Sequence, residues 1–223
     1  RKAVLEHCVK RFKERFEELA YALCIEAGKP IKDARGEVSR LIDTFQVGAE
    51  EAVRIGGEVM DLEISARARG YRGMWKRVPI GPCSLISPFN FPLILSIRAV
   101  APALAAGTTV VLKPDPQTPI AGGYLMARIF EEAGLPVDCL QVLPGGADVG
   151  QAMCADPSIA MISFTGSTAA GSGVGELAGK HLKKVTLELG GKNRLIILDD
   201  ADVELAASCA AWGAYLHQGQ ICM

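Results

Sequence analysis

Hydrophobic positions recur at helical spacing over the first part of the chain. Apolar side chains between residues 4 and 23 share one helical face, and Gly28-Lys29-Pro30 then acts as a stop signal, so the spacing predicts a helix over residues 2–27. A second helix is predicted from there to about Val53. Gly56-Gly57 ends it, and the polar residues 58–80 are expected to hold extended segments.

From Cys83 onward, short apolar runs of strand length alternate with helical runs. The predicted strands span residues 83–87, 108–112, 140–143, 159–164, 184–187 and 195–198. The predicted helices span residues 93–106, 120–133, 147–155, 169–179 and 201–216. Short connections rich in Gly and Pro join them, which indicates an α/β fold with an open, mostly parallel sheet and helices on both faces.

The loops that follow the predicted strands are the expected ligand sites. In open α/β sheets, ligands bind outside the carboxyl ends of the strands. Residues 87–92, 113–119, 144–150, 165–168 and 188–193 all occupy that position. We therefore expect these five loops to gather along one edge of the sheet.

Composition narrows the class of partner. The 223 residues are 49% hydrophobic and 22% charged, with a net charge of −1 and both signs interspersed, so the chain can bury a core and lacks a basic stripe for nucleic acid. The longest apolar stretch, residues 93–112, is interrupted by Arg98, Pro102 and Gly107, which argues against a membrane span. Neither nucleic acid nor a membrane is an expected partner.

The seven cysteines are odd in number and scattered, with no CxxC pair. This argues against a disulfide framework and a zinc site, so no metal is expected, and a reducing cytoplasmic location fits best. Arg1-Lys2 leads directly into the first helix without a signal peptide or an initiating Met. We therefore expect the chain to be cut at both ends.

Several strand ends could hold a phosphate or a sugar. Lys113 is either a donor to such a ligand or a solvated lysine. Gly166 and Ser167 stand where a strand gives way to a helix, which suits either a phosphate site or an ordinary helix cap. Gly146 lies in a tight turn after another strand. The usual dinucleotide fingerprint GxGxxG is absent from the sequence.

Three further residues have the chemistry of acyl transfer. Cys222 follows Gly219-Gln220 and is either an exposed nucleophile or a core thiol. Glu188 ends an apolar strand, a setting that suits a general base, although such a carboxylate can also be structural. Asn90 either holds its loop or directs its amide N–H at a substrate oxygen. His217 could partner the thiol or simply end a helix.

The order and spacing of these motifs resemble the aldehyde dehydrogenase superfamily over nearly the whole chain. The matching segments are Ser87–Pro92, Lys113–Pro119, Phe164–Thr168, Glu188–Lys192 and Gly219–Cys222. The resemblance implies a Rossmann-like NAD(P)-binding domain over residues 1–190, and the beginning of a catalytic domain over residues 191–223, cut just after the nucleophile. It also implies a homo-oligomer for the full-length protein.

The same resemblance implies the catalytic roles. Cys222 would attack the aldehyde to give a thiohemiacetal, while Asn90 and the backbone N–H of Cys222 hold the oxyanion. Hydride would pass to the nicotinamide and leave a thioester, and Glu188 would activate the water that releases the acid. If so, Cys222, Glu188 and Asn90 are the catalytic residues.

The implied cofactor is NAD or NADP. Lys113 matches the residue that bonds the adenosine ribose, and Gly166 with Ser167 matches the pyrophosphate-side loop. Pro116 departs from the pattern, because many NAD-preferring members carry a Glu at this position. Without that carboxylate, a repulsion against the 2′-phosphate of NADP is removed, so NADP use becomes plausible. The implied cofactor-binding residues are Ser87, Pro88, Phe89, Lys113, Pro116, Gly146, Gly166, Ser167 and Leu189.

Residues 113–119 and 214–223 look most like the benzaldehyde and vanillin dehydrogenase branch, so the resemblance favours an aromatic aldehyde as substrate. A phosphorylating or CoA-acylating relative is an alternative, although the water-activating Glu188 argues against the CoA type. A non-catalytic protein on the same fold is another. The 223 residues alone are expected to be inactive, because about half of the catalytic surface is missing.

Overall fold

The structure is a computed structural model that describes residues 1–222. Its helices are α1 Lys2–Glu14, α2 Phe16–Ala27, α3 Ile31–Arg54, α4 Pro92–Ala106, α5 Leu125–Glu132, α6 Ala147–Ala155, α7 Thr168–Lys180 and α8 Val203–Tyr215. Its strands are β1 Gly57–Asp61, β2 Arg72–Lys76, β3 Cys83–Ile86, β4 Val110–Lys113, β5 Leu140–Val142, β6 Met161–Thr165 and β7 Lys184–Glu188. Short helical turns are η1 Ala66–Ala68, η2 Ile120–Tyr124 and η3 Leu216–Gly219.

Five parallel strands form the central sheet in the order β5-β4-β3-β6-β7, which confirms the predicted α/β fold. From β3 the chain proceeds to β4 and β5 on one side, then crosses back to β6 and β7 on the other. The register pairs Ile86 with both Lys113 and Phe164, and Thr165 with Glu188. The carboxyl ends of these strands therefore lie in one row, and the loops after them meet along one edge as predicted.

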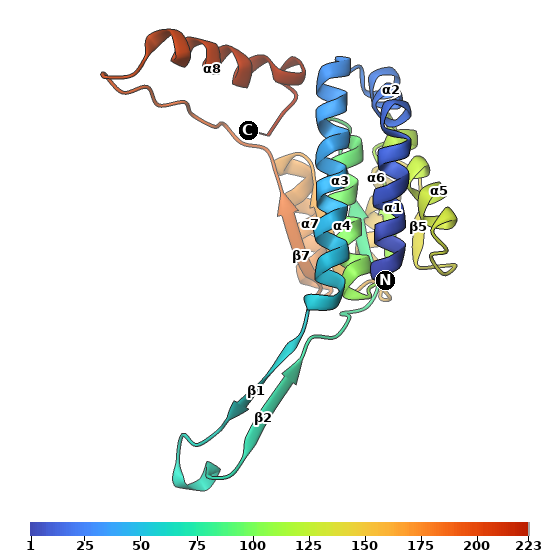
Figure 1. Cartoon of the computed structure of the whole chain (residues 1–223), viewed down its shortest axis with the longest axis vertical. Coiled ribbons are helices and arrows are strands. Elements are labelled where there is room, and N and C mark those ends of the chain that lie inside the picture. The colour runs from blue at the N-terminus through green and yellow to red at the C-terminus, as the bar shows by residue number, and fades with distance from the viewer. Residues whose placement is uncertain (223) are drawn as a thin grey trace.

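Helices cover the sheet on both faces (Figure 1). α4 and α5 pack on one face, with α1, α2 and α3 layered over them, whereas α6 and α7 pack on the other. Phe12, Phe45 and Phe130 are buried among the helices on the α4–α5 side of the sheet. The ring centroids of Phe12 and Phe45 lie 4.8 Å apart, and those of Phe45 and Phe130 lie 5.6 Å apart. Removing each ring from water contributes about 1.5–3 kcal/mol, so this aromatic cluster anchors the helical layer.

Three predicted elements differ in the structure. The single helix expected over residues 2–27 is divided at Arg15, whose backbone (φ −104°, ψ 23°) leaves the helical region. The helix expected over residues 120–133 begins as the π-helical turn η2. The strand expected over residues 195–198 is wrong, because that apolar run has no strand to pair with within residues 1–222 and is exposed.

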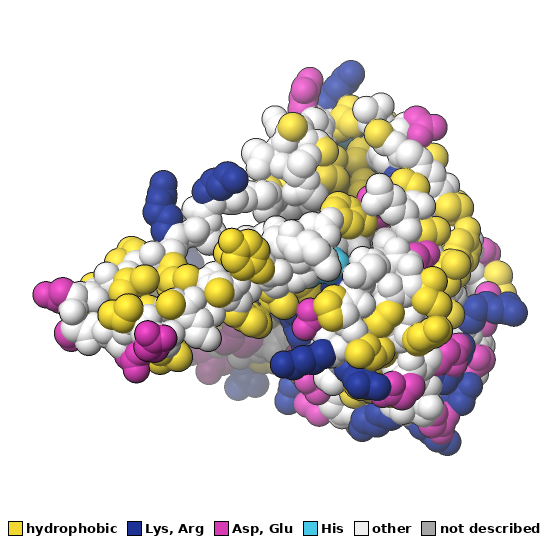
Figure 2. Space-filling view, turned by 90° about the horizontal axis from the view of Figure 1, so that it is seen from above, with side chains coloured by type: hydrophobic (Ala, Val, Ile, Leu, Met, Phe, Trp, Pro, Cys, Tyr) yellow, Lys and Arg dark blue, Asp and Glu magenta, His cyan; other side chains and the backbone are white. Residues whose placement is uncertain are grey.

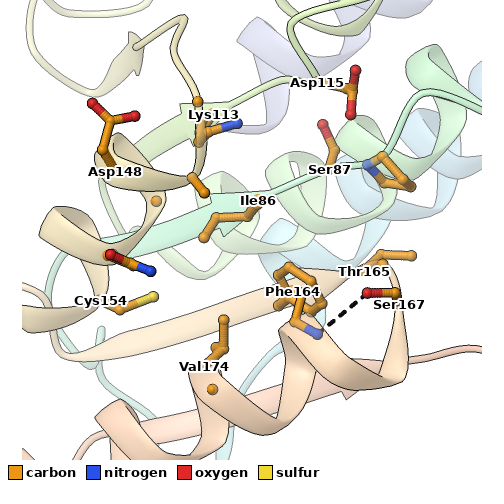
Figure 3. A pocket seen from close by; sticks show the side chains of 18 of the residues that line it. Ile86, Ser87, Lys113, Asp115, Asp148, Cys154, Phe164, Thr165, Ser167 and Val174 are labelled. Carbon is orange, nitrogen blue, oxygen red and sulfur yellow. Dashed lines mark hydrogen bonds between the residues drawn. The ribbon is translucent and has the colours of Figure 1, made fainter.

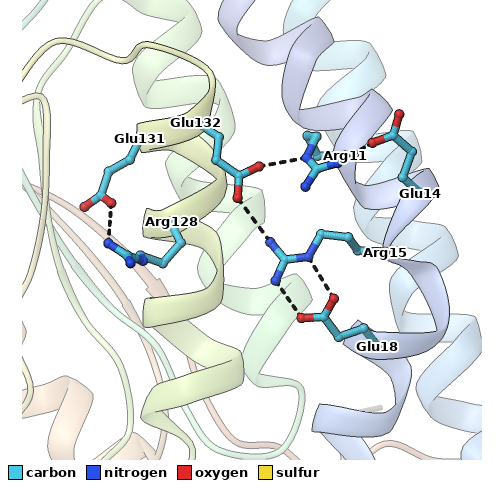
Figure 4. A network of polar contacts seen from close by, with 7 residues as sticks. All are labelled: Arg11, Glu14, Arg15, Glu18, Arg128, Glu131 and Glu132. Atoms are coloured by element: carbon cyan, nitrogen blue, oxygen red, sulfur yellow. Dashed lines mark hydrogen bonds and ion pairs between the residues drawn. The ribbon is translucent and has the colours of Figure 1, made fainter.

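The break at Arg15 coincides with an ion-pair network between the first helices and α5 (Figure 4). The carboxylate of Glu132 lies 2.7 Å from the guanidinium of Arg11 and 3.5 Å from that of Arg15. Arg15 also donates hydrogen bonds to Glu18. Exposed pairs of this kind each contribute about 0–1 kcal/mol. We infer that the network orients α5 against α1 and α2 more than it stabilises the fold.

Two segments extend from the body of the molecule (Figure 1). β1 and β2 form an antiparallel hairpin that projects at one end. α8 stands apart at the other and has no buried residue. Hydrophobic side chains gather on its surface (Figure 2), and Trp212 and Tyr215 are among the exposed ones. The domain predicted over residues 191–223 stays a prediction, and Met223 lies outside the described residues. Within residues 1–222, no helix is both long and apolar enough to cross a membrane.

Candidate active site

A cleft of about 1120 Å³ opens where the strand order reverses, between the ends of β3 and β6 and beside α6 and α7 (Figure 3). All the predicted cofactor residues except Leu189 line it. They are Ser87, Pro88, Phe89, Lys113, Pro116, Gly146, Gly166 and Ser167. Leu189 instead lies against α7, where a Cβ added to Gly171 would come within 2.2 Å of its side chain. The cleft is large enough for an extended ligand.

On the opposite face of the sheet, the N-termini of α4 and η2 are filled by carboxylates of the chain itself. Glu37 on α3 accepts hydrogen bonds from the amides of Leu93 and Ile94 in α4, at 2.9 and 3.0 Å. Glu26 on α2 accepts bonds from the first two amides of η2, at 2.8 and 2.6 Å. A helix N-terminus attracts anions, so these two positions are already occupied.

The N-termini of α6 and α7 face the cleft instead. Ser167 caps α7, where its Oγ accepts a hydrogen bond of 3.2 Å from the amide of Ala170 (Figure 3). A Cβ added at Gly166 would lie 2.6 Å from Cζ of Phe164, so a glycine is needed for the loop to cross that ring. Close backbone approach at a helix N-terminus fits a phosphate group of a dinucleotide.

Lys113 lies at the other end of the cleft and is 6% exposed. Burial lowers the pKa of its ammonium group, whereas the carboxylates of Asp115 and Asp148 act in the opposite direction. Figure 3 shows the lysine between these two acids. A donor flanked by acceptors suits the hydroxyls of a ribose. Sequence reasoning missed Asp148, although its position in the first turn after Gly146 was a usable signal.

The loop after β3 is fixed at its first residue and joined to the far end of the chain. Ser96 donates to Ser87 Oγ at 2.7 Å, and the Ser87 amide donates to the Lys113 carbonyl at 3.1 Å. Asn90 Nδ2 donates to the carbonyl of Gln220 at 2.9 Å, across 130 residues. An amide nitrogen carries two N–H groups, so one can hold the loop while the other is directed at a substrate oxygen.

Cys222 is exposed, as a nucleophile requires. Asn193 Nδ2 donates to its carbonyl at 3.0 Å, which is a second tie between this loop and the rest of the chain. Asn90 and the cysteine loop, far apart in sequence, are thus brought together by the Asn90–Gln220 bond. The catalytic roles of Asn90 and Cys222 stay predictions.

The apolar setting expected for Glu188 is wrong. Its side chain is 59% exposed and lies 3.6 Å from the guanidinium of Arg98 on α4. The reason is that β7 is an edge strand of the sheet, and residues 1–222 leave its end uncovered. Its role as a general base stays a prediction.

Two buried charged residues escaped the sequence analysis. Lys29, read in the sequence as part of a helix stop, forms a fully buried ion pair with Glu37. The signal for Glu37 was its place on the apolar face of the predicted helix, directly before Val38. His217, considered as a thiol partner, packs edge-on against Phe91 with 5.6 Å between ring centroids, and burial lowers its pKa.

Comparison with known proteins gives a consistent result. Residues 1–223 match the model of the aldehyde dehydrogenase family. The chain is 65% identical over 150 residues to vanillin dehydrogenase of Amycolatopsis sp., covering 67% of this chain and 31% of that protein. It is 47% identical to the NAD(+) benzaldehyde dehydrogenase of Pseudomonas putida, covering 100% of this chain and 45% of that protein.

Solved structures agree with the sequence comparison. The NAD+ complex of an aldehyde dehydrogenase from Bacillus cereus superposes with a TM-score of 0.93 at 34% identity, covering 99% of this chain and 44% of that one. The chain spans less than half the length of these relatives. The match over residues 1–223, together with the shared fold, shows that this chain belongs to the aldehyde dehydrogenase family.

Proposed function

We propose that the chain is the cofactor-binding part, with the start of the catalytic domain, of an enzyme that oxidises an aromatic aldehyde to its carboxylic acid with NAD or NADP. The observation that carries this proposal is the hydrogen bond from Asn90 to Gln220, two residues before Cys222. It joins an amide donor to the loop of an exposed thiol. The names of the vanillin and benzaldehyde dehydrogenase relatives support the aromatic class.

In the proposed reaction, the Cys222 thiolate attacks the carbonyl carbon of the aldehyde, and the carbonyl oxygen becomes an oxyanion. The free N–H of Asn90 and the backbone N–H of Cys222 stabilise this charge. When bound, the cofactor would supply the hydride acceptor, and loss of hydride from the adduct on Cys222 would leave a thioester there. Glu188 then takes a proton from water, whose oxygen attacks the thioester and releases the acid and the thiolate.

The cofactor would lie along the cleft. The N-terminus of α7, with Gly166 and Ser167, would take the pyrophosphate, and Lys113 with its flanking acids would take the adenosine ribose, with the turn at Gly146 near the adenine. We also infer a homo-oligomer for the enzyme and a reducing, cytoplasmic location, the latter because all seven cysteines are free.

The test uses the parent enzyme, meaning the longest natural polypeptide that contains this chain. With benzaldehyde it should reduce NAD or NADP, as followed by absorbance of the reduced cofactor, and should do so faster than with an aliphatic aldehyde. The 223 residues alone should give little or no turnover, because Glu188 and Cys222 are exposed at an incomplete site. Absence of turnover by the parent enzyme with either class of aldehyde would refute the proposal.

The identity of residue 116 should set the choice of cofactor. Pro116→Glu places a carboxylate close to Lys113, where it accepts from a ribose hydroxyl and repels a 2′-phosphate. We expect the Kd for NADP in the parent enzyme to rise about tenfold or more, and the Kd for NAD to stay level or fall. Pro116→Gln is the matched neutral control. An equal change for both cofactors would show that this position does not face the ribose.

A further inference from the structure

The buried pair Lys29–Glu37 lies directly beneath the loop that carries Asn90. Both side chains are 0% exposed, and the ammonium lies 3.4 Å from the centroid of the Phe91 ring. Charged residues are almost never buried to this extent unless every group has a partner. The pair therefore has a structural task that outweighs its desolvation cost.

Glu37 performs that task at the start of α4. One carboxylate oxygen receives Lys29, and the other accepts from the amides of Leu93 and Ile94. Phe91 is the N-cap residue of α4 and has no polar side chain with which to cap it. The carboxylate from α3 supplies the missing cap, and thereby fixes where the helix begins and where residue 90, just before the cap, is placed.

The same cluster reaches the loop of the proposed nucleophile. The Phe91 ring packs on His217, which is 3% exposed and lies in η3. Asn90 bonds the carbonyl of Gln220, at the end of that turn. The contacts thus run from Glu37 and Lys29, through the start of α4, to the amide and the loop that must meet at one substrate atom.

Resting on the function proposed above, we propose that Glu37, held by Lys29, is a positioning residue for the amide of Asn90. It touches neither the cleft nor the thiol, and acts by setting the position of the Asn90 N–H relative to the reacting carbonyl oxygen. Misplacement of a positioned group by about 1 Å can lower a rate about 100-fold. The effect of Glu37 should therefore appear in the chemical step and depend on the presence of Asn90.

A double-mutant cycle in the parent enzyme tests this. The variants are Glu37→Gln, Asn90→Ala and the two combined, and the readouts are the hydride burst with benzaldehyde at saturating cofactor and the Kd of the cofactor. Glu37→Gln should slow the burst about 10- to 100-fold and leave the Kd within about twofold. In the Asn90→Ala background the same change should slow it less than about threefold, because the amide that Glu37 positions is absent.

Glu26→Gln is the matched control, since Glu26 caps η2 with the same chemistry but does not touch the start of α4. Its effect should be the same with and without Asn90. If Glu37→Gln does not fold, Lys29→Met combined with Glu37→Leu replaces it in the cycle, since this double variant removes the acceptor for the α4 amides and leaves no buried charge. If Glu37→Gln lowered the burst rate by the same factor with Asn90 and with Asn90→Ala, this inference would be overturned while the proposed function would stand. A wild-type parent enzyme without aldehyde turnover would overturn the proposed function, and this inference with it.

Discussion

Cys222→Ala in the parent enzyme should lower aldehyde oxidation by at least about 10³-fold, because no other group in the proposed mechanism forms the bond to the substrate. The methyl group of alanine cannot attack a carbonyl carbon, so neither the hydride step nor the acyl intermediate can follow. Cofactor affinity should be unchanged, since the cleft lining does not include Cys222. The measurements are kcat/KM with benzaldehyde and the Kd of the cofactor.

Cys209→Ala provides a matched control for that variant. Cys209 is also an exposed free thiol, and it lies on α8 in the same part of the chain. Its replacement should change the rate by no more than about twofold. A comparable loss in both variants would indicate that the cysteines matter for assembly, and a fully active Cys222→Ala enzyme would exclude thiol catalysis.

Glu188→Gln should separate the two halves of the reaction. If Glu188 activates water, one equivalent of reduced cofactor per site should still form in a burst, because hydride transfer precedes hydrolysis. The steady-state rate should then fall by about 10²- to 10⁴-fold as the thioester accumulates. Stopped-flow absorbance measures the burst, and mass spectrometry of the quenched protein detects the acyl group on Cys222.

Glu63→Gln, in the exposed loop of the β1–β2 hairpin, is the control for loss of a carboxylate. It should leave both phases unchanged. Loss of the burst in Glu188→Gln would mean that the carboxylate acts before hydride transfer, for example on the thiol. That result would assign Glu188 a different role while leaving Cys222 as the nucleophile.

Periodicity predicted the architecture well where local sequence decides it. The five strands of the central sheet and the helices between them follow from alternating apolar runs and Gly or Pro punctuation, and the left-handed Gly28 (φ 65°) ends α2 as expected. The run at residues 195–198 misled the prediction, because strand formation needs a partner strand and composition alone does not provide one.

The residues that line the cleft were predicted better than the surroundings of Glu188 and the buried ion pair, while the catalytic roles stay predictions. The cleft lining follows from which residues come after strands, a property of order along the chain. The exposure of Glu188 and its contact with Arg98 depend on what covers an edge strand, which no local pattern encodes. In the sequence, Lys29 lies in a helix stop and Glu37 on an apolar helix face. Their ion pair forms only when the tertiary fold brings them together, so local patterns do not reveal it.

The two acids that cap α4 and η2 also bear on how a ligand finds its place. A sheet edge with several helix N-termini, each partly positive, offers a polyanionic ligand more than one position in which to bind. Because Glu26 and Glu37 occupy two of those ends as soon as the chain folds, they would compete with the proposed dinucleotide for them at very high effective concentration. The first turn of α7 carries no acid and lines the cleft, so it is the helix end left open to the proposed ligand.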